Sequence, residues 1–158
     1  MSRPRVSALE ALNAELRDQL AYAVTLGGRT GDVARELDLK IKEHVRHEDE
    51  TVTPLLAAFE DLAAGHWPSD AVVLGERFRA AERSYPALIS EHGDIMLVAG
   101  RLRAVAEAES EEEVVAMCDK LQRLAKVEEK VLYPAAVIAG RYLRMWERER
   151  ERPQFAGD

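Results

Sequence analysis

Apolar residues recur every three or four positions over four long stretches of this chain, which is the pattern of helices with one buried face. The stretches run over about 7–26, 30–64, 87–106 and 110–140. Pro54 and Pro134 predict bends or breaks within the second and fourth helices, because proline cannot donate a helical hydrogen bond. No stretch alternates like a β-strand, so the pattern predicts an all-α fold, an antiparallel four-helix bundle.

Two further segments adjoin these helices. Helical spacing resumes at Asp70 and is interrupted by Pro86, which predicts a short extra helix before the third helix of the bundle. The C-terminal segment is a charged helical extension with the apolar residues Met145 and Trp146, which makes a homodimer through this helix one candidate assembly. We expect a single domain over 1–158, with a core bundle over about 7–140 and the extension over 141–158.

Polar residues interrupt the apolar stripes at positions that face the predicted core. They are Asn13 in the first helix, His44 and Glu48 in the second, His92 in the third and Glu128 in the fourth. Residues four apart share one helix face, so His44 and Glu48 continue the buried row of the second helix. A weak internal repeat supports this arrangement, because Glu48 and Glu128 each stand six positions before a proline. We therefore expect two similar helical hairpins whose polar residues converge.

The converging residues carry chemistry that suits a metal ion. A buried carboxylate is costly unless it is protonated, paired or bound to a cation. Imidazole and carboxylate ligands without thiolate suit iron or manganese, and zinc less specifically. The sequence therefore predicts His44, Glu48, His92 and Glu128 as metal ligands. One alternative is a buried ion-pair network without metal, in which Glu128 pairs with Arg17 or with a protonated histidine.

Composition narrows the classes of partner. The net charge of -7 argues against a nucleic-acid partner, which requires a basic face. Cys118 is the only cysteine, so no internal disulfide forms and a reducing compartment is favoured. The N-terminus lacks the apolar region of a signal peptide, and no stretch reaches membrane-spanning length. We expect a cytoplasmic protein with neither a membrane nor a nucleic-acid partner.

Three motifs stand in order along the chain: His44-x-x-x-Glu48 followed by Pro54, then Glu91-His92, then Glu128-Glu129 followed by Leu132-Tyr133-Pro134. Together they resemble the hemerythrin-like, or HHE cation-binding, family, over roughly residues 7–140. The resemblance implies a four-helix bundle that holds a non-haem di-iron centre. His44, Glu48, His92 and Glu128 match the family's ligand positions, whereas Asn13 and Leu124 stand where the family has histidines.

These two replacements leave three alternatives open: two irons with open coordination, a single divalent metal held by the four matching residues, or no metal. Candidate substitute donors are His47, Glu15, Asp94 and Tyr133. The resemblance implies a small ligand such as dioxygen, peroxide or nitric oxide, with carriage, sensing or a slow peroxidase or oxygenase reaction. The alternative function is a metal-free bundle that acts as an interaction or ligand-binding module.

Overall fold

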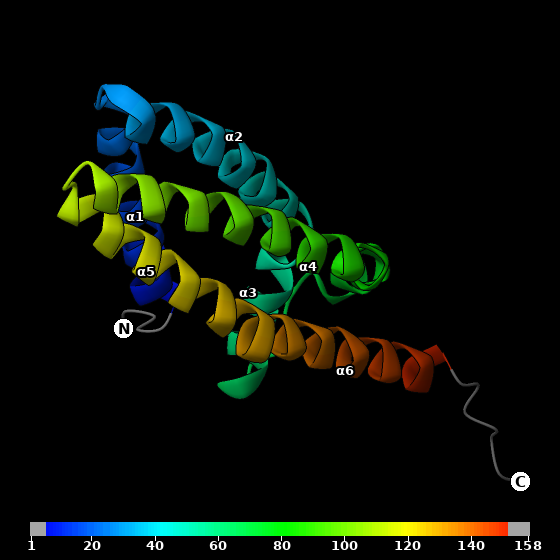
Figure 1. Ribbon diagram of the computed structural model, residues 1–158. Helices are drawn as coiled ribbons and strands as arrows, with labels where there is room; N and C mark the ends of the chain where they lie inside the picture. The colour runs from blue at the N-terminus through cyan, green and yellow to red at the C-terminus, as the bar shows by residue number, and fades with distance from the viewer. Residues whose placement is uncertain (1–5, 152–158) are drawn as a thin grey trace, which may run out of the picture. The chain divides into compact units, whose positions relative to one another are not determined.

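A computed structural model describes the chain from residue 6 to residue 151. Over this range the chain is helical and contains no β-strand, which confirms the all-α class (Figure 1). The elements are α1 (Val6–Thr25), α2 (Gly28–Thr51), α3 (Thr53–Ala63), α4 (Ala71–Ala108), α5 (Glu112–Val127), a π-helical turn (Glu128–Leu132) and α6 (Tyr133–Glu151). None of the described helices combines the length and the apolar character needed to cross a bilayer.

Two of the prolines lie where helical segments change. The second predicted helix divides into α2 and α3, and Pro54 stands in the first turn of α3, where no helical N–H is needed. Pro134 is the second residue of α6 and directly follows the π-helical turn. The predicted C-terminal helical extension is confirmed as far as Glu151, because α6 continues to that residue. Residues 152–158 lie outside the described range.

The predicted extra helix before the third helix is wrong, because residues 71–108 form one helix, α4, that continues through Pro86. Proline inside a helix removes one hydrogen bond and crowds the preceding turn, at a cost of about 3 kcal/mol. Phe78 and Leu88, on either side of the proline, are both fully buried. Burying one such side chain stabilises the fold by about 1.5–3 kcal/mol, so the two together offset the proline.

The chain divides into two compact units. The first comprises Met1–His47 and Ala87–Glu128, and therefore holds α1, most of α2, the second half of α4 and α5. The second comprises Glu48–Pro86 and Glu129–Asp158, with α3, the first half of α4 and α6. One boundary falls directly after Pro86, inside α4. The single domain over 1–158 stays a prediction.

The first unit has one apolar core to which α1, α2, α4 and α5 all contribute. Its fully buried members include Ala23, Leu37 and Leu102. Helices α1 and α5 pack directly against each other. Cys118 belongs to the same core, where burial raises the pKa of its thiol to about 11. The thiol therefore stays protonated at neutral pH and packs as a small apolar side chain.

The start of α2 is held by a carboxylate from the loop between α4 and α5. Glu109, after α4, accepts hydrogen bonds from the backbone N–H groups of Arg29 (3.2 Å) and Thr30 (3.0 Å). Both groups lie in the first turn of α2, where N–H groups have no helical partner. These hydrogen bonds, that of Thr30 above all, lower the pKa of Glu109. Gly28 adopts a φ of +69°, which favours glycine, and a Cβ added there would lie only 3.2 Å from Glu109 Oε1.

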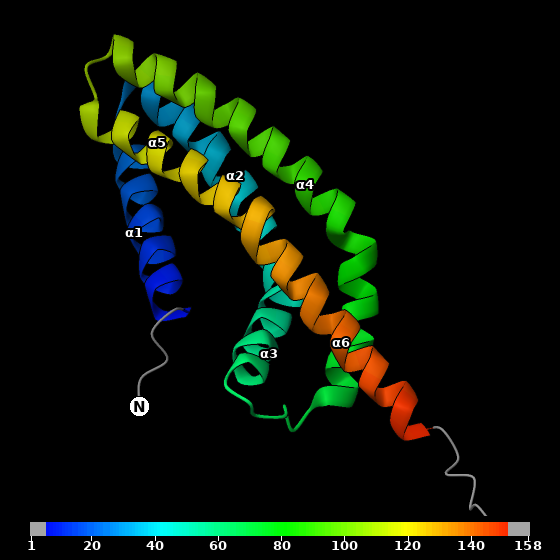
Figure 2. The ribbon, with the colours of Figure 1, turned by 90° about the horizontal axis from the view of Figure 1, so that it is seen from below.

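In the second unit, α3 lies beside α6 (Figure 2). Trp67, in the loop after α3, stacks against Trp146 of α6 with ring centroids 3.9 Å apart. Trp146 of the C-terminal extension is therefore packed within this unit, whereas Met145 is 62% exposed. Gly140 of α6 meets the Phe78 ring so closely that an added Cβ would lie 1.9 Å from Phe78 Cδ2.

We predict that Gly140→Ala lowers the free energy of unfolding by about 1–3 kcal/mol, because the methyl group must displace the buried Phe78 ring. Gly100→Ala is the matched control, since a Cβ added there, also in a helix interior, meets nothing within 4 Å. The control should raise the free energy of unfolding by about 0.5–1 kcal/mol. Urea unfolding followed by circular dichroism measures both. A Gly140→Ala variant as stable as Gly100→Ala would contradict the close contact.

Candidate metal centre

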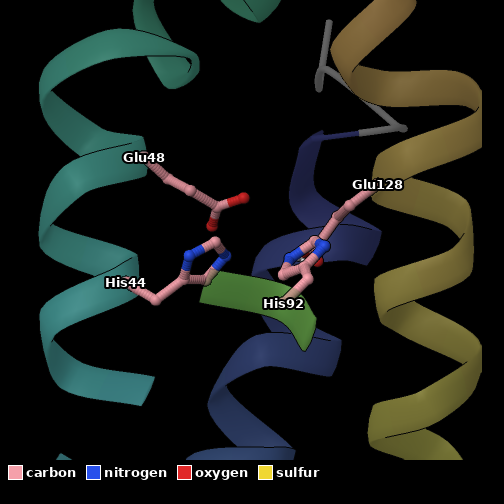
Figure 3. Close-up of side chains that lie close together, drawn as sticks. All are labelled: His44, Glu48, His92 and Glu128. Carbon is pink, nitrogen blue, oxygen red and sulfur yellow. Dashed lines mark ion pairs between the residues drawn. The ribbon is translucent and has the colours of Figure 1, made fainter. Parts of the chain in front are cut away.

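The four residues predicted as metal ligands come together (Figure 3). His44 and Glu48 stand one turn apart on α2, His92 lies on α4, and Glu128 opens the π-helical turn after α5. His44, His92 and Glu128 belong to the first unit, and Glu48 follows on the same unbroken helix as His44. Each residue offers one donor atom, and these atoms lie within 4.8 Å of one another. Their role as ligands stays a prediction.

Three of the four side chains are buried. The exposed fractions are 2% for His92, 5% for His44 and 8% for Glu128, and Glu48 is partly buried. The two imidazole rings lie with their centroids 4.5 Å apart, tilted by 53°. His92 Nε2 lies 3.2 Å from Glu128 Oε2. The buried carboxylate of Glu128 therefore faces an imidazole that can share a proton or a cation with it.

A fifth residue, Glu91, joins the two histidines of α2. Its Oε2 lies 2.8 Å from His44 Nδ1, and its Oε1 lies 2.8 Å from His47 Nδ1. Partial burial by itself would raise the pKa of Glu91, but hydrogen bonds and charge interactions with the two histidines outweigh this and lower the pKa. Glu91 therefore stays ionised at neutral pH and accepts hydrogen bonds from both rings.

Glu48 has its own buried partner in the second unit. The hydroxyl of Tyr133 donates a hydrogen bond of 2.5 Å to Glu48 Oε1. Tyr133 is 1% exposed, and its ring meets the ring of Tyr85 edge-on at 5.9 Å. The hydrogen bond occupies one carboxylate oxygen of Glu48 and orients the other. Tyr133, a candidate donor from the sequence, thus contacts a predicted ligand.

The π-helical turn explains why Glu128 and Tyr133 are both buried. A π-helix has i→i+5 hydrogen bonds, so residues five apart stand on one face, and such turns are frequent at functional sites. A regular α-helix would place Val131, seven residues after the buried Leu124, on the same buried face, but Val131 is 57% exposed. The wider turn rotates it outward and turns Tyr133 inward.

The other residues that the sequence analysis considered for this site have different surroundings. Leu124 is 6% exposed and belongs to the apolar core, and Asn13 is partly buried. Arg17, considered as a partner of Glu128, is exposed and donates to the Asn13 carbonyl oxygen at 3.2 Å. Glu15 and Asp94 form ion pairs with lysines, Glu15 with Lys120 at 2.5 Å and Asp94 with Lys40 at 3.7 Å.

Two imidazoles and two carboxylates fit a divalent ion of the iron, manganese or zinc type, whose bonds to such ligands are about 2.0–2.2 Å long.

The sequence pattern did not predict that Glu91 joins His44 to His47, although Glu91 stands beside His92 in the second of the three motifs. His47 stands three residues after His44, so it lies along the same edge of α2. That spacing is the one local signal that pointed to the pair.

Compared with protein-family models, with curated proteins and with solved structures, the chain shows no significant match.

We predict that Tyr133→Phe lowers the free energy of unfolding of the metal-free protein by about 1.5–3 kcal/mol, the range for hydrogen bonds to charged groups. Phenylalanine keeps the ring contact with Tyr85 but leaves Glu48 without the hydroxyl. The control Tyr142→Phe removes a hydroxyl from a side chain that is 53% exposed, and it should change stability by less than about 0.5 kcal/mol. Equal losses in urea unfolding with chelator present would contradict the assigned contact.

Proposed function

We propose that this chain is a hemerythrin-like protein that binds a divalent metal, iron in the first place, through His44, Glu48, His92 and Glu128. By the same proposal, the metal binds a small oxidant or diatomic ligand, that is dioxygen, peroxide or nitric oxide. The observation that carries the proposal is the convergence of two buried imidazoles and two carboxylates whose donor atoms lie within 4.8 Å of one another. Burying imidazoles and carboxylates costs free energy that an apolar core would avoid, so their presence supports a role in binding.

The connections between helices support the antiparallel bundle that the proposal requires. Only Leu26 and Gly27 separate α1 from α2, and only 109–111 separate α4 from α5. Helices joined by such short links pack as antiparallel neighbours. The shared apolar core of α1, α2, α4 and α5 in the first unit agrees with two hairpins of this kind.

Each side chain has a distinct task in this proposal. His44 and His92 donate neutral nitrogens, while Glu48 and Glu128 supply the negative charge that a divalent cation needs. Tyr133 holds Glu48 Oε1 by a hydrogen bond and so restrains the carboxylate that would coordinate the ion. Bound iron would supply the redox chemistry and the open coordination positions for a small ligand.

The residues at the two altered family positions favour one ion over two. Leu124 is apolar and buried, so it contributes no donor atom. Four donors complete most of the coordination of one ion, since non-haem iron sites with two histidines and one carboxylate already keep open positions. Two ions would have to share the same four groups. We therefore propose a single-metal centre, with a di-iron centre as the alternative stoichiometry.

A metal-free function in partner or ligand binding is the second candidate. The observation that favours it is that the site residues already have protein partners: His44 contacts Glu91, His92 contacts Glu128 and Glu48 contacts Tyr133. A homodimer is one form that this function can take, because α6 presents exposed apolar side chains at helical spacing. These are Ile138, Tyr142 and Met145, which are 62%, 53% and 62% exposed.

The first test measures metal content and absorption spectra of untagged protein from iron-supplemented cells, purified without chelator. We expect about one iron per wild-type chain and an at least tenfold lower content in Glu48→Ala and Glu128→Ala, since each variant removes a donor. Glu43→Ala is the matched control, because Glu43 is an exposed glutamate on the same helix α2, and it should keep the wild-type content. Unchanged metal content in Glu48→Ala and Glu128→Ala would contradict the proposed ligand set.

The second candidate makes the opposite prediction for thermal unfolding. If the site serves a metal-free bundle, the double variant His92→Leu/Glu128→Leu keeps or raises the melting temperature, because an apolar pair replaces both partners of a buried polar pair. If the site binds metal, saturating Mn²⁺ or Fe²⁺ stabilises only the wild type, by about 2.7 kcal/mol at one hundred times Kd. Differential scanning calorimetry with and without metal separates the two functions.

A further inference from the structure

The contacts of Glu91 link the predicted centre to a second histidine that is not among the predicted ligands. Glu91 precedes His92 on α4 and reaches α2, where one carboxylate oxygen meets His44 Nδ1 and the other meets His47 Nδ1, both at 2.8 Å. The His44 side chain is 6% exposed, whereas those of His47 and Glu91 are 22% and 32% exposed. The carboxylate therefore stands between a buried ring and one closer to solvent.

The chemistry of this arrangement fixes the hydrogen positions on both rings. An ionised carboxylate only accepts hydrogen bonds, so Nδ1 of each histidine must carry the hydrogen. A neutral imidazole with its hydrogen on Nδ1 has its lone pair on Nε2. His44 therefore offers Nε2 as its metal donor, and its ring is held by a charge-assisted hydrogen bond. A carboxylate behind a ligating histidine also makes the ring a stronger base toward the metal.

We propose that Glu91 is the positioning residue of the metal centre and that His47 is not a ligand but the anchor that sets the rotation of the Glu91 carboxylate. This inference rests on the proposed metal-binding function. By engaging Oε1, His47 fixes the plane of the carboxylate, so that Oε2 points at His44. His47 thus acts on the metal only through Glu91, which explains why it stands off the buried row of α2 yet one turn from His44.

A purely structural role of Glu91, joining α2 to α4, gives a different expectation. The chain offers a matched control for it, because Glu36 of α2 also joins these helices through its ion pair with Arg101 of α4, at 3.0 Å. If Glu91 only joined the helices, Glu36→Gln and Glu91→Gln would have similar effects. If Glu91 positions His44, only Glu91→Gln affects the metal, because an amide presents one acceptor oxygen and cannot accept from both rings.

The experiment measures Mn²⁺ affinity of the full chain by electron paramagnetic resonance. We expect Glu91→Gln to bind about 10–100-fold more weakly than wild type, the usual loss when the partner of a ligating histidine is removed, and Glu36→Gln to match wild type. His47→Ala should weaken binding in the same direction, and His47→Asn should restore it, since its amide N–H can replace Nδ1–H. The His47 pair keeps the test valid if Glu91→Gln folds poorly.

A second readout needs no metal. The nitrogen-15 chemical shifts of the imidazoles in metal-free protein distinguish Nδ1–H from Nε2–H, and we expect Nδ1–H for His44 and His47 in wild type, with loss of that state for one ring in Glu91→Gln. Wild-type binding with an unaltered Glu91→Gln affinity, or an Nε2–H ring at His44, would overturn the inference and leave the proposed function intact. A wild type that binds no Mn²⁺ or iron would overturn the proposed function and the inference with it.

Discussion

The carboxylate of Glu128 is buried, and the need to balance a buried charge governs the residues around it. An uncompensated charge in such a place costs several kcal/mol, which is a large part of the stability of a domain of this size. The chain meets the requirement with imidazole, since His92 Nε2 faces the carboxylate. Glu48 and Glu91 follow the same rule, because each has a hydrogen-bond partner, Tyr133 and the α2 histidines respectively. The polar groups at the centre of the chain therefore form acid–partner pairs rather than isolated polar residues.

Local helix geometry positions these acidic and histidine side chains. A spacing of four residues places His44 and Glu48 on one face of α2, and consecutive positions on α4 turn Glu91 toward α2 while His92 stays fully buried. Glu128 opens the π-helical turn after α5 and Tyr133 directly follows it, and both residues are buried. A regular α-helix through this segment would separate them by about 140° and expose one of the two. The irregularity is thus part of what forms the cluster.

The all-α class and the convergence of His44, Glu48, His92 and Glu128 were predictable from the sequence, because burial on a helix face follows from spacing along one chain segment. The roles of Glu91 and His47 were not predictable in this way, since both are partly exposed and their relation depends on how α4 meets α2. The exposure of Val131 follows from a π-helical turn that spacing rules for α-helices do not contain. Helix α4 continues through Pro86 because side chains buried on both sides of the proline offset the free energy that the proline costs. The sequence reveals the proline but not how much these side chains are buried.

The distance between His92 Nε2 and Glu128 Oε2 is compatible both with a direct ion pair and with the proposed metal. At 3.2 Å it lies at the upper end of the range for N–H···O hydrogen bonds, so it fits a direct contact. Two donors bound to one ion at about 2.1 Å stand roughly 3.0 Å apart at a right angle and about 3.4 Å apart at the tetrahedral angle. The observed separation lies between these values, whereas the 2.8 Å contacts of Glu91 are those of direct hydrogen bonds. In the proposed centre the two carboxylates would have different tasks: Glu128 would bind the cation, and Glu91 would hold the ring of His44, which would complete the coordination.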